Sequence, residues 1–125
     1  MKNVQAAITA VQGAVPEKIL SNSDLETMVD TNDEWIVSRT GIRERRIIEK
    51  GRTLSDLGAE IVAGICKKRG MSPKDIDMIV VGTITADHRF PSASNLICHK
   101  SGATNAWGFD CLLYTSPSPR DTNES

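Results

Sequence analysis

The sequence predicts an α/β fold with a largely parallel sheet, and two features carry this prediction. After residue 50, segments with helical periodicity alternate with short apolar segments, an order typical of parallel sheets with helices on their faces. The run MIVVGTIT at 78–85 is continuously apolar and rich in β-branched residues, as in a strand buried on both faces. We expect a sheet of three or four strands, unfinished because its outer strands present unpaired edges.

The first fifty residues predict a strand, two short helices and a second, exposed strand. Apolar side chains alternate loosely over 4–11, which indicates the first strand, and 42–50 is expected to hold the second. Gly41 is expected to end the second helix. A Ser or Thr followed three residues later by Glu marks the start of each helix: Ser23 with Glu26, and Thr31 with Glu34.

The second half contains the most regular helical pattern, over 53–69. Its apolar side chains recur at three- and four-residue intervals, which places them on one stripe: Leu54, Leu57, Ile61 and Ile65. Thr53 can cap the start of this helix, and Gly70 ends it. Three shorter elements are expected beyond it: a turn begun by Ser72 and Pro73, a helix within 91–102 and a strand within 105–110.

Composition excludes several classes of function. With 15 basic and 16 acidic residues the net charge is −1, which argues against a nucleic-acid binder because such proteins carry a basic excess. No apolar run reaches the roughly 18 residues of a membrane span, so no membrane partner is expected. The three cysteines show no paired spacing, which favours a reduced, cytoplasmic protein. The 125 residues suffice for one domain.

Trp35 and Arg39 are the first candidate binding residues. They stand four positions apart on a predicted helix and therefore share one face. An indole and a guanidinium at this spacing can hold a flat aromatic group, since stacking on an aromatic side chain contributes ~1–3 kcal/mol and Arg adds a cation–π term. Spacing alone leaves open the alternative of a core Trp beside a solvated Arg.

The segment DTNDEWIVSRTGIRERRI at 30–47 resembles the β-ketoacyl-acyl-carrier-protein synthase III family. VPEKILSNSDLETMVD before it, IDMIVVGTIT and HRFPSAS after it, and AWGFD at the end support the match, which runs from about residue 3 to Asp110. The resemblance implies an α/β fold that is the partial N-terminal half of a thiolase-like fold, with a mostly parallel sheet and helices on its faces. It also implies a homodimeric acyltransferase.

The resemblance assigns roles to four residues. Trp35 and Arg39 match the pair that sandwiches the adenine of coenzyme A, and Thr31 matches a threonine of the same site. Phe90 matches a residue that reaches across the dimer to line the partner's acyl pocket, with an ordinary loop anchor as the alternative. A basic cluster could meet phosphates or be a solvated face: Arg43, Arg45 and Arg46.

The family's reaction joins an acyl-CoA primer to malonyl-acyl-carrier-protein, with decarboxylation, and starts type II fatty acid synthesis. It uses a thiolate nucleophile. The matching position, five after Asp110, is Thr115, and Cys111 is out of register, so no catalytic residue is assigned. The partners implied are acyl-CoA and acyl carrier protein; acyl-CoA is a substrate, and no cofactor is expected. No metal is expected either, although three potential ligands lie close in sequence: His88, Cys98 and His99.

The character of the sequence changes at Cys111. CLLYTSPSPRD at 111–121 shifts to Ser, Pro and Arg, a composition typical of disordered tails. One back-translation of this segment gives a DNA sequence that reads as a transposase end followed by a sequencing adapter. We therefore expect two parts, a truncated N-terminal thiolase-like region at 1–110 and a non-native, adapter-derived tail at 111–125. The nucleotide sequence tests this hypothesis, whose alternative is a natural divergent tail.

Two alternatives to an inactive fragment of a condensing enzyme stay open. The chain could be a coenzyme-A or carrier-protein binding module without catalysis, or part of another thiolase-fold condensing enzyme of secondary metabolism. The gene sequence downstream of Asp110 discriminates among them: a nucleophilic Cys followed by a His and an Asn indicates the enzyme, whereas a natural stop codon near residue 125 indicates the module.

Overall fold

The computed structural model describes residues 6–111, which form two compact units. The smaller unit comprises residues 15–52, and the larger unit comprises residues 6–14 and 53–111. Thr115 and the rest of the expected tail from residue 112 onward lie outside the described residues. The expected α/β class is confirmed, since helices and strands occur in both units.

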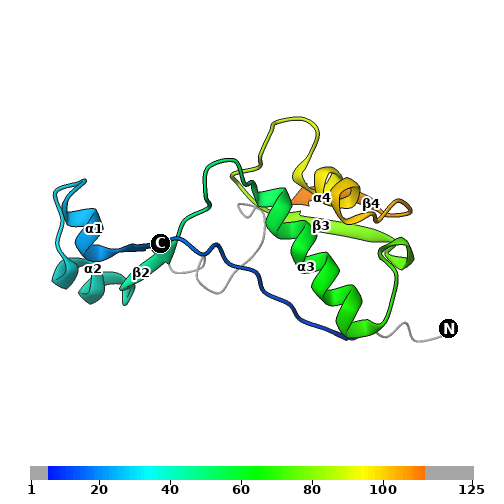
Figure 1. Ribbon diagram of the computed structural model, residues 1–125, viewed down its shortest axis with the longest axis horizontal. Helices are drawn as coiled ribbons and strands as arrows, with labels where there is room; N and C mark the ends of the chain where they lie inside the picture. The colour runs from blue at the N-terminus through cyan, green and yellow to red at the C-terminus, as the bar shows by residue number, and fades with distance from the viewer. Residues whose placement is uncertain (1–5, 112–125) are drawn as a thin grey trace, which may run out of the picture. The chain divides into compact units, whose positions relative to one another are not determined.

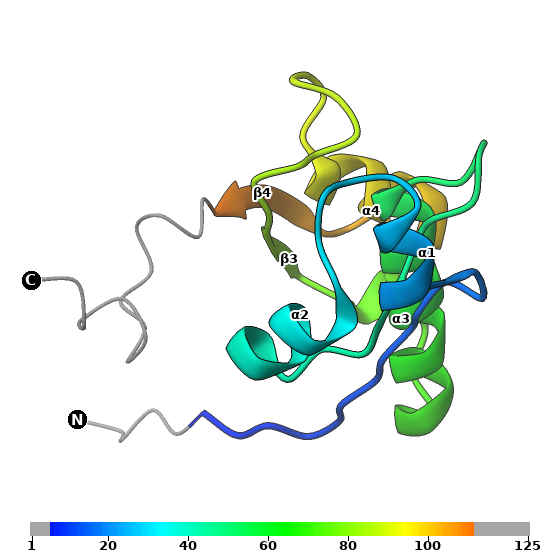
Figure 2. The same cartoon turned by 90° about the vertical axis from the view of Figure 1, so that its left-hand side faces the viewer.

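The smaller unit is a short antiparallel strand pair with two helices between its strands (Figure 1). Strand β1, Ile19–Ser21, pairs with β2, Glu44–Arg46. Helix α1, Asn22–Glu26, and helix α2, Asp33–Thr40, follow one another along the connection (Figure 2). The strand expected within 42–50 is therefore confirmed, whereas its partner β1 carries no clear pattern in the sequence.

The start of α1 differs from the expected capping pair. Ser21 caps the helix: its Oγ accepts from the backbone N–H of Asp24, and the Asp24 carboxylate accepts from the Ser21 backbone N–H at 2.9 Å. The Ser-x-x-acid spacing is the same, but it is moved by two residues. Glu26 lies at the last position of α1, where its carboxylate instead accepts the Asp33 N–H at 2.7 Å.

Helix α2 is likewise capped by a different residue from the one expected. The Asn32 side chain accepts the Trp35 N–H at 2.8 Å, so Thr31 and Glu34 form no capping box. Asn competes well at this position because its short side-chain oxygen reaches the free N–H groups of the first turn. Gly41 ends the helix as expected, in the left-handed conformation with φ of 70°.

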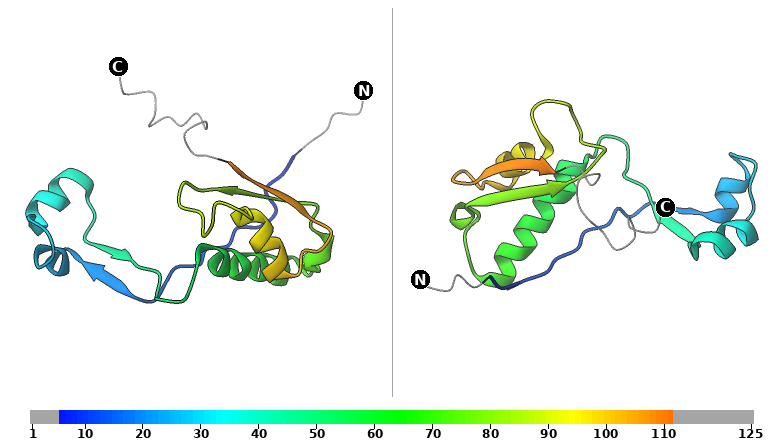
Figure 3. Two further views of the ribbon diagram at one scale, coloured as in Figure 1. Left: turned by 90° about the horizontal axis from the view of Figure 1, so that it is seen from above. Right: turned by 180° about the vertical axis from the view of Figure 1, so that it is seen from behind.

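The larger unit packs two helices on one face of a parallel strand pair (Figure 3). Helix α3, Leu54–Arg69, is followed by a 3₁₀ turn, Pro73–Asp75, and by strand β3, Met78–Gly82. Helix α4, Ala93–Ser101, then leads to strand β4, Trp107–Cys111, which pairs parallel with β3. The expected caps of α3 and of the 3₁₀ turn and the expected end of α3 at Gly70 are confirmed.

The core of the larger unit lies between these helices and one face of the strands. Val62, Cys66 and Ile97 form its buried centre, with Ile79 and Val81 of β3 packed against it. Of the expected α3 stripe, Leu57 is buried, whereas Leu54, Ile61 and Ile65 are only half-buried. The buried face of α3 is thus rotated slightly about the helix axis relative to the expected stripe. The reason is that both α4 and the sheet pack against α3.

The other face of β3 and β4 is not covered within the described residues. Four large side chains on it stay between 43% and 61% exposed: Met78, Val80, Trp107 and Phe109. The expectation that 78–85 is a strand buried on both faces is therefore wrong for the described part of the chain, in which only α3 and α4 supply a packing layer. Trp107 and Phe109 stack on each other instead, with ring centroids 5.6 Å apart.

The strand expected over 4–11 is absent from its described part, residues 6–11. Ile8 is 90% exposed there. Each of the two sheets within residues 6–111 has two strands, so the single sheet of three or four strands is not observed. A strand forms only where a neighbour completes its hydrogen-bond ladder, and β3 pairs with β4 alone among the described strands.

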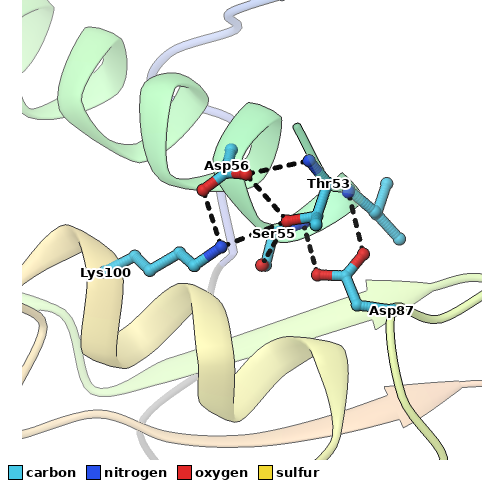
Figure 4. A network of polar contacts seen from close by, with 6 residues as sticks. Thr53, Ser55, Asp56, Asp87 and Lys100 are labelled. Carbon is cyan, nitrogen blue, oxygen red and sulfur yellow. Dashed lines mark hydrogen bonds and ion pairs between the residues drawn. The ribbon is translucent and has the colours of Figure 1, made fainter. Parts of the chain in front are cut away.

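A polar network fixes the start of α3 (Figure 4). The Asp56 carboxylate accepts from Thr53 N–H at 2.8 Å and from Lys100 Nζ at 2.6 Å. Asp87 closes the other side of the same turn, because its two carboxylate oxygens accept the N–H groups of Leu54 at 2.8 Å and of Ser55 at 3.1 Å. The Lys100 ammonium, followed by the Thr53 hydroxyl, lowers the pKa of Asp56 to about 2.

Acid is therefore expected to weaken the larger unit in a defined range. The folded pKa of Asp56 is below its ordinary value of 3.8, so Asp56 stabilises the fold above about pH 4 and loses this contribution as the pH falls through about 2. Lys100→Gln should move the carboxyl pKa upward and start the acid transition at higher pH. A carboxyl titration followed by NMR measures both; Lys67→Gln, on the exposed end of α3, is the control and should leave the Asp56 pKa in place.

Candidate functional site

Helix α2 presents Trp35 and Arg39 together on the surface of the smaller unit. Trp35 is 54% exposed, which rules out the core alternative in the described structure. The guanidinium carbon of Arg39 lies 5.5 Å from the centroid of the indole ring. At this distance the two side chains already make a cation–π contact. The sequence spacing therefore produces the expected juxtaposition.

The space between the two side chains is too narrow for a bound ring. An aromatic group in van der Waals contact with both would need about 7 Å between them, because each contact takes ~3.5 Å. A nucleobase must therefore displace the Arg39 guanidinium from the indole before it can be sandwiched. Arg39 is exposed, so the displacement is sterically open.

Thr31 lies near Trp35. Together with Asp30, Asn32 and Trp35 it lines a depression of about 200 Å³. The depression begins at the N-terminal end of α2 and adjoins one side of the indole. Thr31 and Trp35 thus lie together at this depression, and Arg39 contacts the indole of Trp35 in the same unit.

Two of the three residues of the expected basic cluster, Arg45 and Arg46, are hydrogen-bonded within the protein itself. Arg45 donates to the Asn22 side chain at 2.7 Å. Arg46 donates to the backbone carbonyl of Glu17 at 3.1 Å. Both guanidinium groups therefore join β2 to neighbouring parts of the unit. Arg43 is exposed and is the member of the cluster best placed to meet a phosphate.

The larger unit carries an open cleft of about 680 Å³ at the carboxyl ends of β3 and β4. The ends of parallel strands are where α/β sheets bind ligands. Side chains from the 83–92 loop and from β4 line it, among them Thr83, Asp87, Ser92 and Asp110. Phe90 belongs to the same loop and is 89% exposed.

Two carboxylates that no sequence pattern predicted as site residues shape this cleft. Asp87 caps α3, and Asp110 caps α4 by accepting the N–H groups of Ala93 and Ser94, both at 2.8 Å. Burial opposes ionisation of Asp110, but these hydrogen bonds outweigh it and keep its pKa below the ordinary range. The cleft wall is therefore anchored to two helix N-termini, which favour negative charge.

A repeated sequence signal could have indicated these caps. Each of these two helices begins with a Ser or Thr that is followed two residues later by a Ser. The two hydroxyls are hydrogen-bonded to each other in both cases, at 3.0 Å between Thr53 and Ser55 and at 2.9 Å between Ser92 and Ser94. Which distant carboxylate meets each helix start is not encoded in that local pattern.

Within residues 6–111 the side chains assemble no nucleophilic or metal-binding constellation. Cys111 is half-buried at the end of β4, and burial raises the pKa of the Cys98 thiol, which makes that group a poorer nucleophile. No cluster of three potential metal ligands occurs among the described residues, and His88 and His99 are exposed.

Among the helices of the described segment, none has the length and apolar character needed to cross a bilayer. No family model matches the chain. Relatives are nevertheless found by sequence: the β-ketoacyl-[acyl-carrier-protein] synthase III of Koribacter versatilis is 49% identical over 106 residues, which make up 85% of this chain and 32% of that protein. The chain thus spans about a third of the length of the curated relatives it matches.

Solved structures agree with the sequence comparison. The β-ketoacyl-[acyl-carrier-protein] synthase III of Thermus thermophilus superposes with a TM-score of 0.77 at 36% identity, over 86% of this chain and 33% of that one. The priming β-ketosynthase of the R1128 polyketide pathway gives 0.73 at 38% identity, over 79% and 30%. In sequence and in its thiolase-like fold, the chain is therefore similar to about one third of a β-ketoacyl-[acyl-carrier-protein] synthase III.

Proposed function

We propose that residues 1–110 are part of a condensing enzyme that joins an acyl-CoA primer to malonyl-acyl-carrier-protein, with loss of carbon dioxide, in the first step of type II fatty acid synthesis. The observation that carries the proposal is the exposed Trp35–Arg39 pair, with Thr31 beside it, on a chain similar to such enzymes. Within this proposal, the pair binds the adenine of the acyl-CoA.

The larger unit has a different role in this proposal. Its cleft at the ends of β3 and β4 forms part of the wall around the reacting thioester, and Phe90 reaches into the acyl pocket of a second subunit in a homodimer. The thiolate that accepts the acyl group comes from outside residues 1–110, because the position expected for it is Thr115. The 125-residue chain itself is therefore proposed to be inactive, and a cytoplasmic location stays a prediction from its cysteine pattern.

A direct binding experiment tests the proposed nucleotide site. The chain has two tryptophans, so Trp107→Phe leaves Trp35 as the only indole and makes its fluorescence specific. Titration with CoA should quench this emission to saturation, and adenosine diphosphate should compete whereas pantetheine should not. Quenching of equal size in the Trp35→Phe variant, which retains only Trp107, would contradict the assignment.

One observation favours a second candidate function. The structural likeness to a priming β-ketosynthase of a polyketide pathway, with a TM-score of 0.73, equals that to the 3-oxoacyl-[acyl-carrier-protein] synthase III of Aquifex aeolicus. Both candidates use the same stacking pair for a CoA-bound primer. They are distinguished by the acyl group accepted when residues 1–110 are joined to the remaining two thirds of a related synthase: a short primer such as acetyl-CoA supports the first candidate.

A further inference from the structure

One buried side chain, Asn22, holds both ends of the helix that carries Trp35 and Arg39. Asn22 is only 2% exposed. Its Nδ2 donates to Oδ1 of Asp33, the first residue of α2, at 2.7 Å. The same nitrogen donates to the carbonyl oxygen of Ile42, immediately after the glycine that ends α2, at 2.9 Å.

The remaining polar groups of Asn22 tie this clamp to the strand pair. Its Oδ1 accepts from Nη2 of Arg45 on β2 at 2.7 Å. Its backbone N–H donates to the carbonyl of Arg43 at 3.2 Å. Both donors and the acceptor of the buried amide are thus used, and such a fully satisfied group fixes the geometry of the elements it joins.

Packing alone fixes α2 poorly. The helix has eight residues, too few to be stable in isolation, and Ile36 is its only buried side chain. One buried apolar side chain restrains rotation of the helix about its axis less than hydrogen bonds at both of its ends do. Since Trp35 and Arg39 are exposed, their orientation depends on how the backbone of α2 is held.

We propose that Asn22 is a positioning residue for nucleotide binding: without touching the ligand, it holds α2 in the one orientation that keeps Trp35 and Arg39 aligned for a CoA adenine. This inference rests on the proposed function. It adds the requirement that Asn22 hold α2 in place for Trp35 and Arg39 to bind CoA. A purely structural role for Asn22 would lower stability and leave the affinity of the folded protein unchanged.

The test uses the full 125-residue chain with Trp107→Phe and measures CoA affinity through Trp35 fluorescence. Asn22→Asp preserves shape and the acceptor for Arg45 but turns a second oxygen toward Asp33 and the Ile42 carbonyl. Asp33→Asn is the matched control, because it retains an acceptor oxygen for Asn22. In the double variant, which combines Asn22→Asp with Asp33→Asn, the amide at position 33 can donate to the carboxylate at position 22. The hydrogen bond between the two positions is then restored in the reverse direction.

We expect Asn22→Asp to weaken CoA binding at least tenfold at a temperature where far-UV circular dichroism shows a folded chain. Asp33→Asn should stay within twofold of the parent, and the double variant should recover at least threefold over Asn22→Asp. If Asn22→Asp does not fold, Asp33→Ala replaces it against the same control.

Each remaining outcome is decisive. The role of Asn22 would be overturned if Asn22→Asp bound CoA with the affinity of the parent while a Trp35→Ala variant that retains Trp107 had lost binding. Calorimetry measures CoA binding in the Trp35→Ala variant. This result would leave the proposed function standing. A parent chain that shows no CoA-dependent change in emission would remove the proposed function, and this inference with it.

Discussion

Replacement of Trp35 by Ala in an intact synthase that contains residues 1–110 is expected to raise the KM for acyl-CoA by about 5- to 150-fold. This range corresponds to the ~1–3 kcal/mol that stacking of a base on an aromatic side chain contributes. The adenine is remote from the reacting carbonyl, so the contact should be equal in the ground and transition states. The loss then appears in KM while kcat stays close to that of the parent.

The second substrate supplies the internal control for this prediction. Malonyl-acyl-carrier-protein has no adenine on its arm, so its KM should change little. Steady-state kinetics with each substrate varied in turn, on a fusion of residues 1–110 to the remaining two thirds of the Koribacter versatilis synthase, measure both constants. Equal losses for the two substrates, together with a lower melting temperature, would show that Trp35 supports the fold and not the nucleotide.

Gly108→Ala is expected to destabilise the larger unit by about 1–3 kcal/mol, the usual range for overpacking a close contact. A Cβ at this position in β4 would lie 2.8 Å from Cβ of Ser94 and 3.1 Å from the backbone oxygen of Ile79. Neither neighbour can move freely, because Ser94 is fully buried in α4 and the oxygen belongs to the paired strand β3.

The same substitution should loosen the cleft wall. Close approach of β4 to α4 at Gly108 is what lets the Asp110 carboxylate reach the N–H groups of Ala93 and Ser94. Thermal or denaturant unfolding followed by circular dichroism measures the loss. Gly13→Ala is the matched control, since a Cβ there meets no atom within 4 Å. Equal stability of the two variants would show that β4 does not depend on this contact.

Helix ends were the part of the fold that sequence could predict best. Gly41 and Gly70 end α2 and α3 in the left-handed conformation, and Thr53 begins α3, because caps depend on residues within one turn of the helix. The same locality explains the errors. Near Ser21 and Asn32 several residues can cap, and the choice among them depends on what the other acidic side chains contact, as Glu26 shows by binding the Asp33 N–H.

The candidate site likewise has features that the sequence predicted and features that it could not predict. The four-residue spacing placed Trp35 and Arg39 on one helical face, and the resemblance of 30–47 implied a ligand for them. Sequence could not give the direct contact of 5.5 Å between them, which is shorter than the ~7 Å that an aromatic ring held between them would need. Nor could it give the buried amide of Asn22, which joins residues 11 and 20 positions away.

By itself, the sequence determined the α/β class, the glycine ends of α2 and α3, and the placement of Trp35 and Arg39 on one helical face, since each depends on residue type and on spacings of a few positions. Only the tertiary structure decided which carboxylates cap α3 and α4, how α2 is held at both ends, and that one face of β3 and β4 stays exposed among the described residues. These features join groups distant in the chain, as Asp87 and Leu54 are, 33 positions apart. Their partners are selected when the elements pack, and local propensity does not specify them.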